Sequence, residues 1–160
     1  MTRLLLDVNV VLDFLLDRAP FAGAASQLWA TAERRRIEAF VPAHGVTTLF
    51  YVTARERDAR FARRVLQDLL AVAAVAAVDD AVLRRALASP CPDFEDAVCL
   101  AAAEAAGCAM LVTRDPSGYR GAALPIVDPG TAVVLVSGEP PDAVGEPSRS
   151  HRPPRRRRRR

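Results

Sequence analysis

The chain has 160 residues, of which 51% are hydrophobic, and a net charge of +3, so it can form one domain with a core of ordinary size. No apolar run approaches the roughly 20 residues needed to cross a bilayer. Acidic residues interrupt the start of the chain, so we expect a cytoplasmic protein with no signal peptide and no membrane partner. Three cysteines without a C-x-x-C spacing are expected to be free, packed thiols rather than zinc ligands.

Short aliphatic runs alternate with helical patterns along the chain. The predicted strands are residues 4–6, 37–41, 75–78, 110–112 and 124–127. The predicted helices are residues 8–16, 21–36, 44–57, 60–72, 81–88 and 93–106, with a short helix or extended segment over 129–136. This alternation predicts an α/β fold of three layers, α/β/α, around a central parallel sheet of four to five strands.

The composition changes after residue 136, which predicts a domain boundary there. Residues 1–136 form the predicted domain, and residues 137–160, rich in Pro, Gly, Glu and Arg, are expected to be a disordered tail. Eight Arg give this tail a charge of +5, so the domain itself carries −2. The six terminal Arg either bind polyanions such as nucleic acid non-specifically or form an extension without a role.

Three aspartates lie where a site of an α/β protein is expected. Asp7 follows the first predicted strand, Asp115 follows the fourth closely, and Asp96 lies in the first turn of the helix that Asp93 begins. Sites in parallel sheets form beyond the carboxyl ends of the strands, so these carboxylates can converge if the two strands are neighbours. The alternative is that each acid only caps a helix, as we expect of Asp93.

Three carboxylates in one cleft repel one another and need a cation. The chain has no Lys, and the nearest Arg is Arg114, so a divalent metal ion is the natural partner. Ligands that are all oxygen favour Mg²⁺ or Mn²⁺ over zinc, and such an ion can activate water for phosphodiester hydrolysis. The sequence lacks nucleotide-binding glycine motifs and the G-x-S-x-G nucleophile motif.

The acidic segments resemble, in order and spacing, those of the PIN domain family over about residues 3–130. The segments that resemble its first, third and fourth acidic motifs are Leu-Leu-Leu-Asp7-Val-Asn9-Val-Val-Leu-Asp13, Asp93-Phe-Glu-Asp96-Ala-Val and Leu-Val-Thr113-Arg-Asp115. The resemblance implies an endoribonuclease dependent on Mg²⁺ or Mn²⁺, often the VapC-like toxin of a type II toxin–antitoxin pair. It implies catalytic and metal-binding roles for Asp7, Asp96 and Asp115. The residues expected to support this site are Asn9, Thr48, His44, Thr113 and Asp93.

Two positions depart from the family pattern. The residue after the first aspartate, usually Thr or Ser, is Val8, and the family's second acid corresponds to Thr48. Losing that carboxylate is expected to weaken metal binding, although the Thr48 hydroxyl can still orient a water. His44 lies one turn earlier on the same helix face, where it can ligate metal, contact a phosphate or be a structural hydrogen-bonding residue.

Three functions follow from these observations. The first is a metal-dependent endoribonuclease with Arg114 and Arg120 as candidate RNA contacts, for which the family implies a cognate antitoxin and a homodimer. The second is a catalytically impaired PIN-like module for RNA binding or protein interaction, lacking the acid at Thr48. The third, a receiver-like phosphoacceptor, is disfavoured because the sequence has no Lys and offers only Asp79 and Asp80 after the third strand.

Overall fold

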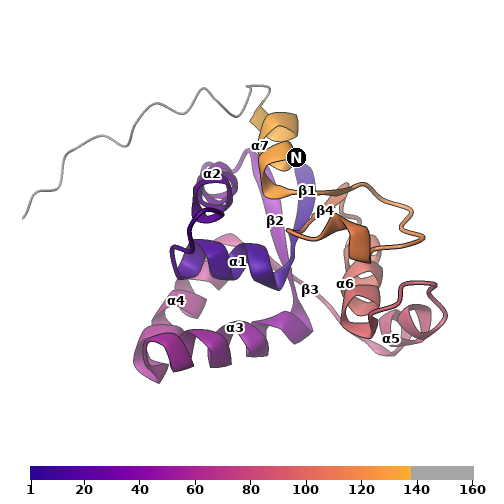
Figure 1. The fold of residues 1–160 in the computed structure, drawn as a ribbon, viewed down its shortest axis with the longest axis horizontal. Coiled ribbons are helices and arrows are strands. Elements are labelled where there is room, and N and C mark those ends of the chain that lie inside the picture. The colour runs from indigo at the N-terminus through magenta and orange to yellow at the C-terminus, as the bar shows by residue number, and fades with distance from the viewer. Residues whose placement is uncertain (138–160) are drawn as a thin grey trace, which may run out of the picture.

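A computed structural model describes residues 1–137, in which a parallel sheet lies between two layers of helices (Figure 1). The strands are β1 (Thr2–Leu6), β2 (Ile37–Pro42), β3 (Ala74–Ala76), β4 (Met110–Val112) and β5 (Ile126–Val127). All neighbouring strands are parallel, in the order β3-β2-β1-β4-β5. The predicted three-layer α/β/α fold with a parallel sheet of four to five strands is confirmed.

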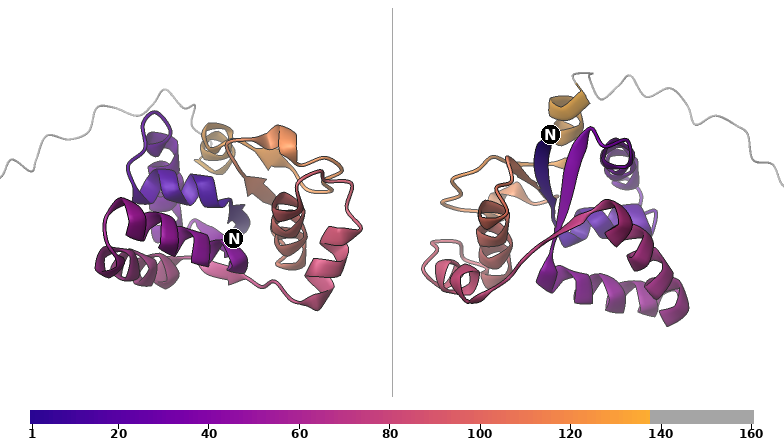
Figure 2. Two further views of the ribbon diagram at one scale, coloured as in Figure 1. Left: turned by 60° about the horizontal axis from the view of Figure 1, so that its bottom comes forward. Right: turned by 180° about the vertical axis from the view of Figure 1, so that it is seen from behind.

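Helices cover both faces of the sheet, as Figures 1 and 2 show. They are α1 (Val8–Leu15), α2 (Ala22–Glu33), α3 (Ala43–Glu56), α4 (Ala59–Val72), α5 (Asp80–Leu87), α6 (Phe94–Ala105) and α7 (Pro129–Ser137), with a short 3-10 turn, η1 (Pro116–Gly118). Helices α1 to α4 and α7 lie on one face, and α5 and α6 lie on the other.

Alternate residues of β1 belong to different cores. Leu4 and Leu6 pack among residues of α1, α2 and α4, whereas Leu5 packs among residues of α5 and α6. Each of these leucines is at most 2% exposed, and burial of one such side chain contributes roughly 1.5–3 kcal/mol. Burial on both faces explains why the strand is an uninterrupted aliphatic run instead of an alternating one.

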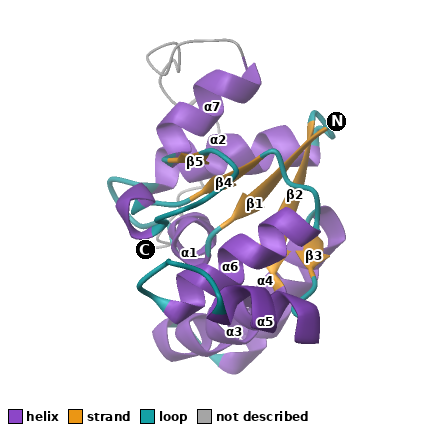
Figure 3. Ribbon diagram, turned by 90° about the vertical axis from the view of Figure 1, so that its right-hand side faces the viewer, coloured by secondary structure: helices purple, strands orange, loops and turns teal. Residues whose placement is uncertain are grey.

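The strands β1 and β4 are neighbours in the middle of the sheet, as Figure 3 shows from the side of α5 and α6. Leu6 pairs with Val112, so both strands end at the same level. The Asp7 amide donates to the Val112 carbonyl at 2.9 Å, which carries the pairing one step beyond β1. The two strands are therefore neighbours, which is the condition on which the predicted convergence of Asp7 with the end of the fourth strand depends.

Several element boundaries differ from the predicted ones. The third strand covers Ala74–Ala76 rather than 75–78, because its partner β2 ends at Pro42, opposite Ala76. The last strand has only two residues, and α2 ends at Glu33, three residues before its predicted end, where the chain turns with Arg35 at a φ of 53°.

The predicted domain boundary falls one residue inside α7, because Ser137 closes that helix. The rest of the predicted disordered tail, residues 138–160, lies outside the described residues. All three cysteines are free and buried, as predicted. Within the described part of the chain, no helix is both long enough and apolar enough to span a membrane.

Candidate functional site

Asp7 is both a helix cap and a wall of a pocket. It is the N-cap of α1, and its Oδ1 accepts a 2.7 Å hydrogen bond from the Val8 amide. Its Oδ2 accepts two hydrogen bonds of 2.8 Å, from Asn9 Nδ2 and from the Thr113 hydroxyl. Donors on both oxygens fix the direction of this carboxylate at the end of β1.

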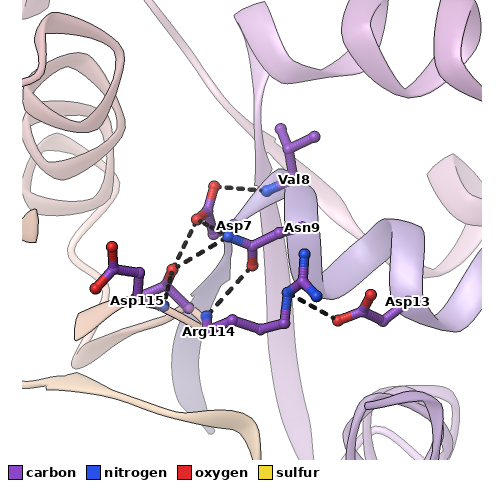
Figure 4. A network of polar contacts seen from close by, with 7 residues as sticks. Asp7, Val8, Asn9, Asp13, Arg114 and Asp115 are labelled. Atoms are coloured by element: carbon purple, nitrogen blue, oxygen red, sulfur yellow. Dashed lines mark hydrogen bonds and ion pairs between the residues drawn. The ribbon is translucent and has the colours of Figure 1, made fainter. Parts of the chain in front are cut away.

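The Thr113 hydroxyl is hydrogen-bonded to Asp7, Asn9 and Asp115, which Figure 4 labels. Thr113 is 1% exposed, and its oxygen also accepts from the Asp115 amide at 3.2 Å. Asn9 Oδ1 accepts from the Arg114 amide at 3.3 Å. The residues after β4 are thereby joined to the first turn of α1, and the predicted supporting residues Asn9 and Thr113 both contact Asp7.

Asp96 reaches the same pocket from the first turn of α6. Asp93 is the N-cap of this helix, and its Oδ1 accepts a 3.0 Å hydrogen bond from the Asp96 amide, so Asp93 supports the site as a cap. Burial raises the pKa of the Asp96 carboxyl, and the charges of Asp93, Asp7 and Glu95 raise it further, while the Tyr119 hydroxyl lowers it. Because these acids repel one another, a positive charge in the pocket would stabilise their ionised forms.

The pocket lies between the starts of α1, α3 and α6 and has a volume of about 270 Å³. His44 Nε2 lies 4.0 Å from Glu95 Oε1 across it. Cys99 is 2% exposed, and burial strongly raises the pKa of its thiol, so it acts as a neutral wall. The residues that line the pocket are Asp7, Val8, Asn9, Leu12, Arg18, His44, Glu95, Asp96, Cys99 and Arg114.

Val8 packs against the start of α3. A Cβ atom at Gly45 would lie 2.5 Å from Val8 Cγ2 and 3.1 Å from Pro42 Cγ, so a side chain there would require its neighbours to shift. The Val8 side chain therefore lies close to the backbone of α3 at Gly45.

The position of the missing acid stays outside the pocket. Thr48 is half-buried on α3 and does not line the cavity, whereas His44, one turn earlier, does. His44 Nδ1 is buried without a hydrogen-bond partner in the described part of the chain. The structure thus places His44, and not Thr48, beside Asp7 and Asp96.

Asp115 lies beside the pocket instead of lining it. Its carboxylate is exposed, and Oδ1 accepts a 2.6 Å hydrogen bond from the Ser117 hydroxyl. Its connection to Asp7 runs through the Thr113 hydroxyl, which accepts from the Asp115 amide and donates to Asp7. The three predicted ligands are thus arranged as two within the pocket and one at its edge.

The two candidate RNA-binding arginines differ in their surroundings. Arg114 lines the pocket, and its Nε lies 3.3 Å from Oδ2 of the fully buried Asp13. Its guanidinium also lies 4.5 Å above the centre of the Phe21 ring. Arg120 is exposed after η1 and does not line the pocket.

The residues present suit a hard divalent cation with a partly aqueous coordination shell. Asp7, Asp96 and Glu95 offer only oxygen ligands, and in residues 1–137 neither Asp7 nor Asp96 forms an ion pair with an arginine. No three His, Cys, Asp or Glu side chains among the same residues form a complete metal cluster. Mg²⁺ keeps several waters and is commonly held by one or two protein carboxylates, so Asp7 and Asp96 fit this mode of binding.

Sequence reasoning missed the pocket residues Glu95 and Cys99, and also Asp13, which pairs with the pocket residue Arg114. Glu95 lies inside the segment that resembles the third motif, and its place in the first turn of α6 was an available signal. Asp13 is an acid among mostly apolar residues of α1, which is a signal of a buried charge. The sequence offered no signal for Cys99, because a thiol in an apolar helix has the pattern of an ordinary core residue.

Comparison with known proteins identifies the family of this chain. The model of the PIN domain family matches residues 3–117, which hold Asp7, Asp96 and Asp115. A search of curated protein sequences returned no match.

Solved structures with this fold include toxin–antitoxin proteins at low sequence identity. VapBC2 from Rickettsia felis, bound to a DNA fragment from its promoter, has a TM-score of 0.58 at 11% identity and covers 79% of this chain and 98% of its own. FitAcB from Neisseria gonorrhoeae has a TM-score of 0.56 at 16% identity, covering 79% and 97%. VapC20 from Mycobacterium tuberculosis, a toxin that cleaves the sarcin–ricin loop, has a TM-score of 0.55 at 17% identity, covering 74% and 90%.

Proposed function

Because the chain belongs to the PIN domain family, we propose that it is an endoribonuclease dependent on Mg²⁺ or Mn²⁺. The observation that carries this proposal is the placement of Asp7 and Asp96 in one pocket. They come from the end of β1 and the first turn of α6, and within the described residues neither pairs with an arginine. A divalent ion held by such a carboxylate pair can activate water for the hydrolysis of phosphodiester bonds.

Several polar residues in and beside the pocket have distinct parts in this proposal. Asp7 and Asp96 would hold the ion, while Asn9 and Thr113 keep the Asp7 carboxylate in place. When bound, the ion supplies a Lewis acid that polarises the phosphate and acidifies water. Asp115, at the edge of the pocket, would complete the site or orient the attacking water.

His44 and Glu95 form the wall of the pocket on the side of α3 and α6. There His44 would act in place of the acid that the family has at the position of Thr48. It would do so through a hydrogen bond to phosphate or as a ligand of the metal ion. The imidazole adds a donor beside two carboxylates that otherwise repel a polyanion.

We also propose that the chain is the toxin of a type II toxin–antitoxin pair, with RNA as its substrate. The structures of VapBC2 and FitAcB support a cognate antitoxin as partner, and the cleavage of the sarcin–ricin loop by VapC20 supports RNA as the substrate class. A homodimer in the cytoplasm belongs to the same proposal.

A second candidate is a catalytically impaired PIN-like module that binds RNA or a protein. The observation that favours it is the donor set: Thr48 replaces an acid, and the described residues form no metal cluster of three ligands. This candidate predicts RNA or antitoxin binding without turnover.

The two candidates separate in a cleavage assay on labelled RNA with Mn²⁺. The variants are Asp7→Asn and Asp96→Asn, and the matched control is Asp68→Asn, an exposed aspartate on α4 that does not line the pocket. Loss of cleavage in the first two alone supports the nuclease. RNA binding without cleavage by the wild type favours the impaired module.

A further inference from the structure

Arg114 is held on several sides at the edge of the pocket. Its Nε lies 3.3 Å from Asp13 Oδ2, and its guanidinium lies 4.5 Å from the centre of the Phe21 ring. Its backbone N–H donates to Asn9 Oδ1, the residue whose side-chain nitrogen donates to Asp7 (Figure 4). The position of the guanidinium is therefore fixed relative to the Asp7 carboxylate.

Asp13 is an unusual residue for its surroundings. It is 0% exposed, and neither of its carboxylate oxygens accepts a hydrogen bond from the residues that the structure describes. Its neighbours on α1 are the buried Val10, Val11 and Leu12. A buried ion pair is weak evidence for stability, since apolar residues of similar size often stabilise a protein as well or better. Stability alone therefore does not explain the buried acid. Asp13 faces Arg114, and a role in holding the Arg114 guanidinium explains the acid better.

The guanidinium has further donors for a ligand. Its ion pair with Asp13 uses Nε, and a guanidinium carries four more N–H donors on its two terminal nitrogens. The Arg114 side chain is 32% exposed and lines the same pocket as Asp7 and Asp96. Paired terminal N–H groups match the oxygens of a phosphate in a bidentate manner.

We infer that Arg114 binds a backbone phosphate of the RNA at the mouth of the pocket, and that Asp13 is the positioning residue that holds its guanidinium there. This inference rests on the proposed function for the choice of RNA as the ligand. It gives the acidic pocket a fixed cation for a polyanion and assigns a role to the buried carboxylate. Asp13 touches no substrate and acts only through Arg114.

The test measures the affinity of a labelled single-stranded RNA at several salt concentrations in EDTA, where metal-dependent cleavage does not occur. Asp13→Leu removes the positioning acid and places an apolar side chain beside the buried Val10, Val11 and Leu12. Asp13→Leu/Arg114→Gln removes both charges and so avoids leaving a buried carboxylate unpaired. The matched control is Asp80→Asn/Arg84→Gln, which removes an exposed ion pair on α5. Thermal unfolding establishes that each variant is folded.

The double variant at positions 13 and 114 is expected to bind RNA about tenfold more weakly, because a charge-assisted contact is lost. Its salt slope should fall by about 0.7, the value for one phosphate contact on a single strand. Folded Asp13→Leu should also bind more weakly than wild type, by no more than the double variant, and the control should match wild type. Wild-type affinity in the double variant overturns the phosphate contact, and wild-type affinity in Asp13→Leu overturns the positioning role.

The same measurements test the RNA contact of Arg114 separately from the nuclease activity. Cleavage in Mn²⁺ that needs Asp96, together with RNA affinity unchanged in the double variant, rejects the role of Arg114 and supports the nuclease. Absence of cleavage, together with the expected loss of affinity and salt slope, supports Arg114 as the phosphate contact and rejects turnover.

Discussion

The Thr113 hydroxyl donates a 2.8 Å hydrogen bond to Asp7 Oδ2, and this bond joins the end of β4 to the end of β1. The two residues are 106 positions apart in the chain and meet because their strands are neighbours. Thr113 also accepts from the amide of Asp115. One buried hydroxyl therefore orients a proposed metal ligand and the loop that carries another.

Replacing Thr113 by valine should affect both the site and the fold. The change keeps the shape but removes the donor to Asp7 and the acceptor for the Asp115 amide. We expect Mn²⁺ affinity to fall about tenfold or more, as for other residues that orient metal ligands. The free energy of unfolding should fall by about 1–3 kcal/mol. Calorimetric titration with Mn²⁺ and urea unfolding measure the two effects.

The matched control for Thr113→Val is Thr131→Val. This change removes a hydrogen bond from a threonine hydroxyl to Asp128 at the start of α7. It should leave Mn²⁺ affinity unchanged. Equal Mn²⁺ affinities for wild type and Thr113→Val would contradict an orienting role for Thr113.

Metal affinity should depend on pH through Asp96. Burial and nearby carboxylates raise the pKa of Asp96, so it takes up a proton at a higher pH than an ordinary aspartate. Protons therefore compete with the ion, and Mn²⁺ affinity should decrease as the pH falls from neutral, beginning above the ordinary aspartate range near 4. Calorimetric titrations over this range test the expectation, and Asp96→Asn should lack this component. A flat profile down to a pH of about 4 would exclude a raised pKa at Asp96.

The lack of a side chain at Gly118 should matter for the position of the Asp96 carboxylate and little for the stability of the fold. A Cβ atom at position 118 would lie 2.9 Å from Asp96 Oδ2, the flexible end of that side chain. Gly118→Ala should therefore displace the carboxylate and reduce kcat about ten- to a hundredfold, as small misplacements in active sites do. The free energy of unfolding should change by less than about 1 kcal/mol.

The control for this variant is Gly23→Ala in α2, where a new Cβ meets nothing within 4 Å. It should raise the free energy of unfolding by about 0.5–1 kcal/mol, because alanine favours the helix, and leave kcat unchanged. Equal kcat values for both alanine variants would show that Gly118 has no bearing on the site.

Gly45 should be needed for the packing of α3 on α1. Its missing Cβ leaves room for Val8, which would otherwise lie 2.5 Å away. Gly45→Ala is expected to lower the free energy of unfolding by about 1–3 kcal/mol through overpacking. Val8→Ala/Gly45→Ala should recover part of this loss, measured by urea unfolding. If the double variant loses the sum of the two single losses, the proposed contact does not limit the packing.

Sequence periodicity was sufficient to predict the strands and their parallel arrangement. The aliphatic runs that end at Leu6 and Val112 marked two buried strands, and alternation with helices indicated a parallel arrangement. That these two strands are neighbours, Leu6 beside Val112, depends on long-range packing that periodicity does not contain. From the sequence, convergence of the aspartates could therefore be predicted only on the condition that the two strands are neighbours.

Side-chain directions and pairings around the pocket were harder to predict from the sequence than the strands that end beside it. Asp115 follows β4 at the expected spacing, but beyond Thr113 the chain turns so that its carboxylate meets Ser117. The direction of a side chain after the last paired residue depends on local turn geometry, which spacing does not determine. The pairing of Asp13 with Arg114 joins residues 101 positions apart, and a pattern within one helix cannot reveal such a partner.

The most direct measurement is the rate of RNA cleavage as a function of Mn²⁺ concentration for the wild type and Asp96→Asn, with Asp68→Asn as control. We expect a rate that saturates with Mn²⁺ for wild type and control, and a loss of at least about a hundredfold for Asp96→Asn at the same concentrations. Equal rates for wild type and Asp96→Asn, or cleavage that persists undiminished in EDTA, would contradict a metal-dependent site built on Asp7 and Asp96.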